Sequence, residues 1–131
     1  MADTRRPLSP HLQVYRWQVQ MVSSILHRAT GVALAVGSAL VVAGLLALAG
    51  GEQSFGAFRQ VAGSLLGMLL LFGWSWALFY HLCNGIRHLI QDAGAGYAIA
   101  QFVRSSWLSV GVSIVLTLLT WAYVLTAGGA A

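Results

Sequence analysis

The sequence contains no lysine and little charge of either sign. Only 8% of its 131 residues are charged and 58% are hydrophobic, whereas soluble domains carry roughly 25% charged residues. This composition excludes an ordinary soluble domain and indicates a membrane protein, whose helices pack against one another in lipid. The seven cationic residues are all arginines, spread along an apolar chain. They form no dense basic patch of the kind that nucleic-acid binding requires, so we expect no nucleic acid among the partners.

A second scarcity is cysteine, of which the chain has one, Cys83. A single cysteine excludes a disulfide within the chain and says little about the compartment. The first 20 residues lack both the apolar run of a secretory signal peptide and the serine-rich amphipathic pattern of a transit peptide. We therefore expect residues 1–20 to be a cytoplasmic N-terminal segment of a bacterial protein rather than of an imported organellar one.

Three long apolar segments account for most of the chain, at about residues 21–49, 61–88 and 105–127. Each reaches the ~20 residues that a helix needs to cross ~30 Å of hydrocarbon. Because backbone polar groups in lipid must be satisfied within the segment, the pattern predicts three transmembrane helices in a single all-α membrane domain, residues 1–131. The connections GGEQSFGAFRQ and DAGAGYAIAQFVR contain loop-forming glycine, so we expect loops there.

Small residues recur every four positions on the first two segments, as Ala29, Ala33 and Gly37 and as Gly63 and Gly67. Such spacing lets two helix backbones approach closely, although small residues are also simply abundant in this chain. Three helices make a thin bundle, which favours a further partner in the membrane.

The arginines are distributed unevenly between the two ends of the predicted helices. Only Arg59 lies between the first and second segments. The other six precede or open the first segment or flank the second connection: Arg5, Arg6, Arg16, Arg28, Arg87 and Arg104. By the positive-inside rule, the N-terminus faces the cytoplasm and the C-terminus the periplasm, in a multi-pass protein of the bacterial cytoplasmic (inner) membrane.

The first polar cluster lies in MVSSILHRATG, where Ser24, His27 and Arg28 are spaced i, i+3 and i+4. On a helix this spacing places a hydroxyl, an imidazole and a guanidinium on one face. A hydroxyl donor and a cationic donor facing one cavity would hold a lipid-soluble carbonyl compound such as a quinone. Alternatively, Ser24 bonds back to the carbonyl four residues earlier, and Arg28 is an interfacial anchor that extends toward the headgroups.

The second polar cluster lies in HLCNGIRHLIQD, where His81, Gly85 and His88 share one helical face. The two histidines are ~10 Å apart along the helix axis, too far for both to bind one metal ion. His81 lies within the apolar run, where a polar side chain usually faces a bundle interior or a functional site. It is either an axial ligand of haem iron, with Gly85 leaving room for the flat macrocycle, or a histidine hydrogen-bonded inside the bundle. Arg87 and His88 belong to this site or are interfacial residues.

Together the two clusters resemble a known family, the cytochrome b (b556) membrane-anchor subunits of succinate dehydrogenase, respiratory complex II. The resemblance is carried by RPLSPHLQVYR followed by SILHRATG, and then by HLCNGIRHLIQD. It covers most of the first two predicted helices, whereas the third agrees only in hydrophobicity. One departure is Gln91, where the family usually has an aromatic residue or methionine.

The resemblance implies an anchor that binds haem b and quinone. His81 matches the family's axial ligand of the haem iron, and the second axial histidine would come from a second membrane-anchor subunit. Ser24 and Arg28 match residues of the quinone pocket, for ubiquinone or menaquinone. His27, Arg28 and His88 match the neighbourhood of the haem propionates.

The resemblance also implies a complex. A flavoprotein subunit would oxidise succinate, an iron–sulfur subunit would relay the electrons, and the two anchor subunits would pack into a larger helical bundle. The chain would not be catalytic alone but would contribute the quinone-reduction site of an oxidoreductase of the tricarboxylic acid cycle and aerobic respiratory chain. A quinol:fumarate reductase anchor and a haem-free structural anchor for a soluble dehydrogenase are the alternatives. A channel or transport subunit is disfavoured, because no acidic residue lies within a predicted span.

Overall fold

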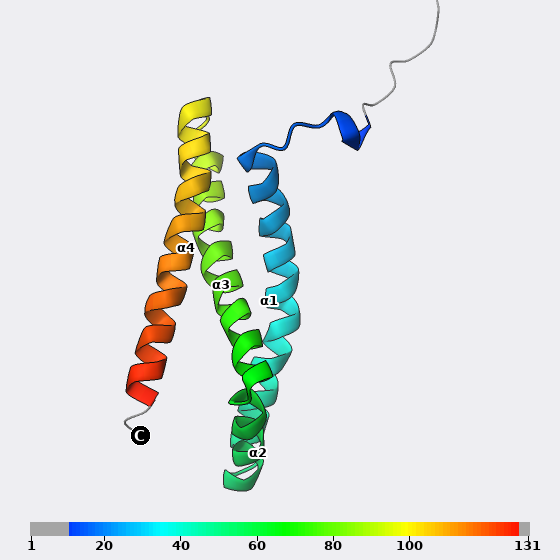
Figure 1. The fold of residues 1–131 in the computed structure, drawn as a ribbon, viewed down its shortest axis with the longest axis vertical. Helices are drawn as coiled ribbons and strands as arrows, with labels where there is room; N and C mark the ends of the chain where they lie inside the picture. Colours follow the sequence, from blue (N-terminus) through cyan, green and yellow to red (C-terminus); the bar gives the residue numbers. More distant parts are fainter. Residues whose placement is uncertain (1–10, 129–131) are drawn as a thin grey trace, which may run out of the picture.

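The computed structural model describes residues 11–128, and this part of the chain is almost entirely helical (Figure 1). Its elements are the 3₁₀ helix η1 (Leu12–Val14), α1 (Val19–Ala49), α2 (Glu52–Ala62), α3 (Leu65–Asp92) and α4 (Ile99–Ala127). Figure 1 shows α1, α3 and α4 as three long helices side by side, with the short α2 at the end of the bundle opposite the α3–α4 connection. No β-strand occurs among the described residues. Arg5 and Arg6 lie outside them.

Three helices in the described part of the chain are long and apolar enough to cross a membrane, which confirms the predicted all-α membrane fold. The helices α1, α3 and α4 contain 31, 28 and 29 residues, more than the ~20 that a span needs. The second long helix runs from Leu65 to Asp92 instead of 61–88, and the third begins at Ile99 instead of 105. Hydropathy marks the residues expected in hydrocarbon, whereas a helix continues beyond them while its backbone bonds remain satisfied.

The connection between the first two long helices is itself helical, which corrects the loop expected for GGEQSFGAFRQ. Only residues 50 and 51 separate α1 from α2, and Gly51 has a φ of 94°, a conformation that favours glycine. Glu52 lies in the first turn of α2 and Arg59 in its last, and each charge stabilises its end of the helix dipole. The internal Gly56 lowers helix propensity by only about 1 kcal/mol relative to alanine, so its presence did not exclude a helix.

The junction of α2 and α3 contains Gly63 and Gly67, whose spacing was compatible either with close helix packing or with the general abundance of small residues. Gly63 follows the last residue of α2, and the Ser64 hydroxyl accepts a 3.1 Å hydrogen bond from the backbone N–H of Gly67 in the first turn of α3. A side chain at Gly67 would overlap the carbonyl oxygen of Val61. Gly63 and Gly67 therefore form a capped tight turn, and the packing interpretation is wrong for this pair.

The side chains buried between the helices are mostly polar. The buried residues are Ser23, Thr30 and Gly37 on α1, Ala77, Tyr80, Asn84, Arg87 and Gln91 on α3, and Ser106, Ser109, Ser113 and Thr117 on α4. Large apolar side chains are exposed along the outside of all three helices. This distribution is the one expected in lipid, where apolar side chains are solvated outside and small or polar residues mediate helix contacts.

The buried face of α4 is a row of hydroxyl side chains that hydrogen-bond within their own helix. Ser106 Oγ donates to the carbonyl of Phe102 at 2.9 Å, and Thr117 Oγ1 donates to the carbonyl of Ser113 at 2.8 Å. These bonds satisfy the hydroxyls without a partner from another helix. The small side chains let α4 pack closely on α3, its main neighbour.

On α1, the close approach to α3 is centred on Gly37. A Cβ at this position would overlap the indole ring of Trp74. We therefore expect Gly37→Ala to displace the indole and to lower the free energy of unfolding by about 1–3 kcal/mol, the usual effect of overpacking. Thermal unfolding of the purified complex measures the change. Gly73→Ala is the matched control, because a Cβ there meets no atom within 4 Å; equal melting temperatures for the two variants would contradict the prediction.

Candidate functional site

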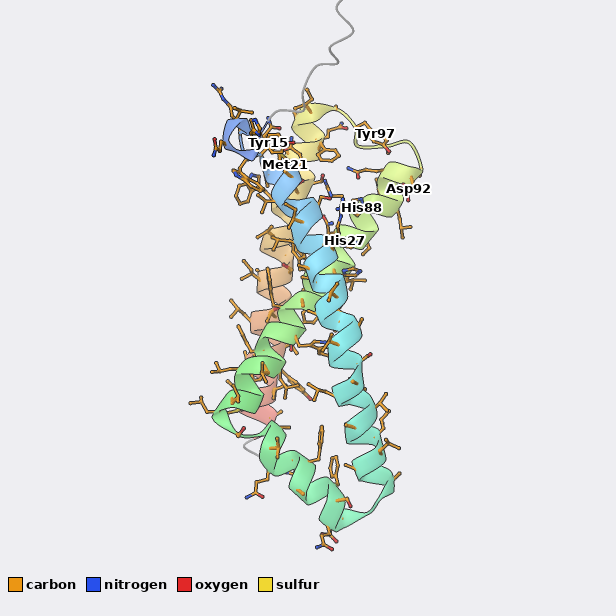
Figure 2. All side chains as sticks on the ribbon, turned by 90° about the vertical axis from the view of Figure 1, so that its right-hand side faces the viewer. Tyr15, Met21, His27, His88, Asp92 and Tyr97 are labelled. Carbon is orange, nitrogen blue, oxygen red and sulfur yellow. The ribbon has the colours of Figure 1, made fainter. Side chains whose placement is uncertain are left out.

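Three of the four histidines meet between α1 and α3, near the end of the bundle where α3 connects to α4. Figure 2 shows His27 on α1 and His88 on α3 at this end. The rings of His27 and His81 are stacked, with centroids 3.9 Å apart and planes inclined by 12°. The His88 ring lies 5.0 Å from His27 and is tilted by 55°. The structure thus brings together three residues that the sequence placed in two separate clusters.

One ring nitrogen of His81 is held by the backbone of α1. Its Nδ1 lies 3.1 Å from the carbonyl oxygen of His27 and 3.3 Å from Thr30 Oγ1. The Thr30 hydroxyl itself donates to the carbonyl of Leu26, at 2.7 Å, so its oxygen accepts from His81. Because a carbonyl oxygen can only accept, Nδ1 must donate, and in the neutral imidazole Nε2 then keeps its lone pair.

Nε2 of His81 is therefore the nitrogen that is available to a metal. It makes no hydrogen bond within residues 11–128 and is not among their buried unpaired atoms. Metal-binding histidines typically donate their other ring N–H to a backbone carbonyl, which fixes the ring and its tautomer. No three His, Cys, Asp or Glu side chains in the described part of the chain are arranged to hold one metal ion. A metal bound by His81 therefore needs most of its ligands from elsewhere.

Two glycines border the stacked histidines. A Cβ at Gly31 would lie 3.1 Å from Cε1 of His81, and a Cβ at Gly85 would lie 3.9 Å from Cε1 of His27. Gly31 thus keeps a side chain from crowding the His81 ring, whereas a Cβ at Gly85 would make only an ordinary van der Waals contact with His27. Nδ1 of His27 is buried and has no hydrogen-bond partner among the described residues.

Next to the histidines lies a hydrogen-bond network centred on Asn84, which is fully buried. Its Oδ1 accepts from Ser23 Oγ at 2.9 Å and from the guanidinium of Arg87 at 3.0 Å, and its Nδ2 lies 3.2 Å from Nε2 of His88. The Tyr80 hydroxyl donates to the carbonyl of Ser23 at 3.0 Å. Sequence reasoning did not identify Ser23, Tyr80 or Asn84. Their signal is the spacing of Tyr80, Asn84 and Arg87, which places polar groups on one face of an apolar helix.

Arg87 faces the bundle interior, so the interpretation as an interfacial anchor is wrong. Its side chain is only 6% exposed. In addition to the bond to Asn84, its Nε donates to Ser105 Oγ at 3.2 Å, and its Cζ lies 4.4 Å from the ring centroid of Phe102 on α4. Hydrogen bonds and a cation–π contact replace a carboxylate as the partners of this charge.

The predicted pair Ser24 and Arg28 occupies a different side of α1 from Ser23. Ser24 is half-buried and Arg28 is exposed. Arg28 makes no hydrogen bond to another residue among those described, and the structure does not join it to the His27–His81 pair. Gln91, the departure noted in the second motif, is buried, and its side-chain nitrogen is unpaired within residues 11–128.

Comparison with known proteins gives one consistent result. Residues 2–120 match the succinate dehydrogenase/fumarate reductase transmembrane subunit family. The chain is 45% identical over 123 residues to the succinate dehydrogenase cytochrome b556 subunit of Paracoccus denitrificans, covering 92% of this chain and 95% of that protein. The cytochrome b556 subunit of Rickettsia felis is 42% identical, covering 89% and 91%. The mitochondrial cytochrome b560 subunit of Sus scrofa is 41% identical, covering 89% and 68%.

Proposed function

The chain belongs to the succinate dehydrogenase/fumarate reductase transmembrane subunit family, and from this we propose that it is the anchor that binds haem b and quinone in succinate:quinone oxidoreductase. It passes electrons from the iron–sulfur subunit to ubiquinone or menaquinone. The observation that carries the proposal is the position of His81 Nδ1, 3.1 Å from the carbonyl oxygen of His27. The Nδ1–H of His81 is engaged by the backbone of α1, which leaves the Nε2 lone pair for iron.

The residues around His81 fit a haem. Gly31 keeps a side chain from the His81 ring, and His27 has a buried nitrogen without a partner among the described residues. His81 would hold the haem iron, and His27, Arg28 and His88 are the residues proposed for the neighbourhood of the propionates. Haem b supplies one-electron transfer when it is bound. The family resemblance implies that the second histidine ligand would come from the second anchor subunit, and this agrees with His81 and His88 lying seven residues apart on one helix.

For the quinone, Ser24 and Arg28 are the proposed binding residues. They lie one turn apart on α1, and the exposed Arg28 is free to contact a ligand or a partner subunit. A guanidinium donates hydrogen bonds and accepts none. It would therefore stabilise the negative charge that develops on a quinone oxygen during reduction.

The distribution of the arginines supports an orientation of the chain in the membrane. Arg16 and Arg28, together with Arg87 and Arg104, lie toward the end where α1 begins and α3 meets α4, whereas Arg59 lies on α2 at the other end (Figure 1). The positive-inside rule then places the histidine cluster near the cytoplasmic face of the bacterial inner membrane. There the iron–sulfur and flavoprotein subunits would dock, and electrons would enter close to the quinone. The alternative, a fumarate reductase anchor, uses the same site in the reverse direction.

A reduced-minus-oxidised visible spectrum of the purified complex tests this function. We expect a b-type haem signal, together with succinate-dependent reduction of a soluble quinone analogue. The iron–sulfur and flavoprotein subunits alone, released from the membrane, are the control and should keep succinate oxidation with an artificial acceptor but lose both other properties. A complex without haem would instead support the structural-anchor alternative.

A further inference from the structure

The hydrogen bonds around Asn84 have a fixed direction that reaches His88. Arg87 sets it, because a guanidinium is always protonated and can only donate. The atom of Asn84 that lies 3.0 Å from the Arg87 nitrogen must therefore be the carbonyl oxygen. If the amide were turned by 180°, two donors would face each other in a fully buried site.

The orientation of Asn84 in turn fixes the proton of His88. With Oδ1 committed to Arg87 and Ser23, Nδ2 is the atom that lies 3.2 Å from Nε2 of His88. An amide nitrogen can only donate, so Nε2 of His88 must accept and is unprotonated. The ring proton of His88 is then on Nδ1. This nitrogen makes no hydrogen bond within residues 11–128 and is not one of their buried unpaired atoms.

We propose that Arg87 and Asn84 are positioning residues that hold His88 as an Nδ1–H donor toward the haem site. This inference rests on the proposed function for the identity of the ligand, but not for the tautomer. His81 and His88 share one face of α3, but their free ring nitrogens have opposite roles. Nε2 of His81 offers a lone pair, whereas Nδ1 of His88 offers a proton. An iron porphyrin matches both, since its metal accepts a lone pair and its carboxylates accept a hydrogen bond.

The buried charge of Arg87 thus has a role that is exerted through Asn84, to which its guanidinium donates. Each contact of the chain Arg87–Asn84–His88 is 3.0–3.2 Å long, and the intermediate residue, Asn84, is fully buried. Ser23 also donates to Asn84, but a hydroxyl can donate or accept. Ser23 therefore does not determine the orientation of the amide, whereas Arg87 does.

Solid-state ¹⁵N NMR of the whole complex in membranes, labelled with [¹⁵N]histidine, tests the proposal. The His88 signals are assigned by difference from a His88→Gln sample. We expect wild type to have a protonated Nδ1 and an unprotonated Nε2. Asn84→Asp, which has nearly the same shape and can only accept, should move the proton to Nε2. Ser23→Ala, the matched control, should leave the proton on Nδ1.

A wild-type His88 protonated at Nε2, or an Asn84→Asp variant with an unchanged tautomer, would overturn the proposal. So would Ser23→Ala moving the proton. If Asn84→Asp does not assemble, Arg87→Met serves instead and should divide the His88 signal between the two tautomers. The visible spectrum of the same samples separates the two claims: absence of haem from wild type would refute the proposed function, whereas the ¹⁵N signals decide the tautomer in either case.

Discussion

Replacing His81 with alanine should remove the b-type haem signal from the purified complex. The imidazole Nε2 is the atom that would bind iron, and no neighbouring side chain among residues 11–128 completes a metal site in its place. Substitution of groups that merely orient a metal-binding histidine costs about 10–100-fold in metal affinity, so loss of the ligand itself should cost at least that much. The reduced-minus-oxidised spectrum of His81→Ala should show no haem or a high-spin form.

The matched control for this experiment is His11→Ala. His11 is exposed and lies before α1, outside the histidine cluster, so its loss should leave the spectrum unchanged. Assembly of the complex is followed by subunit composition, because an unassembled complex would also lack haem. An assembled His81→Ala complex with a normal low-spin signal would show that His81 is a packed polar residue and not a ligand.

Arg28→Leu should abolish quinone reduction while leaving the oxidation of succinate intact. The removal of one donor that stabilises developing negative charge typically lowers kcat by about 10²–10³-fold. Arg28 is exposed on α1, so leucine in its place creates no cavity and should not destabilise the bundle. The rate with a quinone analogue, compared with the rate with an artificial electron acceptor on the same preparation, measures the effect.

Arg104→Leu is the control for charge. Arg104 is exposed in the first turns of α4, near the same end of the bundle, and carries the same charge as Arg28. If loss of a cationic anchor were sufficient, the two variants would have equal quinone reductase rates. We expect Arg104→Leu to retain activity, and an Arg28→Leu complex with full quinone activity would remove Arg28 from the site.

The histidine cluster shows which side-chain contacts a sequence pattern can predict and which it cannot. The pattern correctly paired His81 with His88 on one face of α3, because residues seven apart on a helix are about two turns apart. It did not relate His27 to His81, which stack across two helices at 3.9 Å. A helical pattern specifies which residues share a face, but not which face of the neighbouring helix they meet.

The same limit explains the serines of α1. Ser24 is the residue that the motif selected, yet Ser23 is the buried one that bonds to Asn84. Adjacent residues on a helix point about 100° apart. When one serine faces the interior of the bundle, the next one therefore points to the side of the helix. Because α1 is apolar over most of its length, hydropathy does not distinguish these two orientations.

Hydrophobicity determined the number of membrane helices in this sequence, because backbone groups in lipid leave no alternative to helices. The distribution of the arginines and the spacing of His81 and His88 were also determined by the sequence, because both follow from residue positions along the chain alone. Tertiary structure decided which polar groups face inward: it turned Arg87 into the bundle, placed the carbonyl of His27 against His81 and aligned Asn84 with His88. These outcomes depend on how α1, α3 and α4 rotate against one another, and that rotation is set by close contacts such as Gly37 against Trp74, which no single segment encodes.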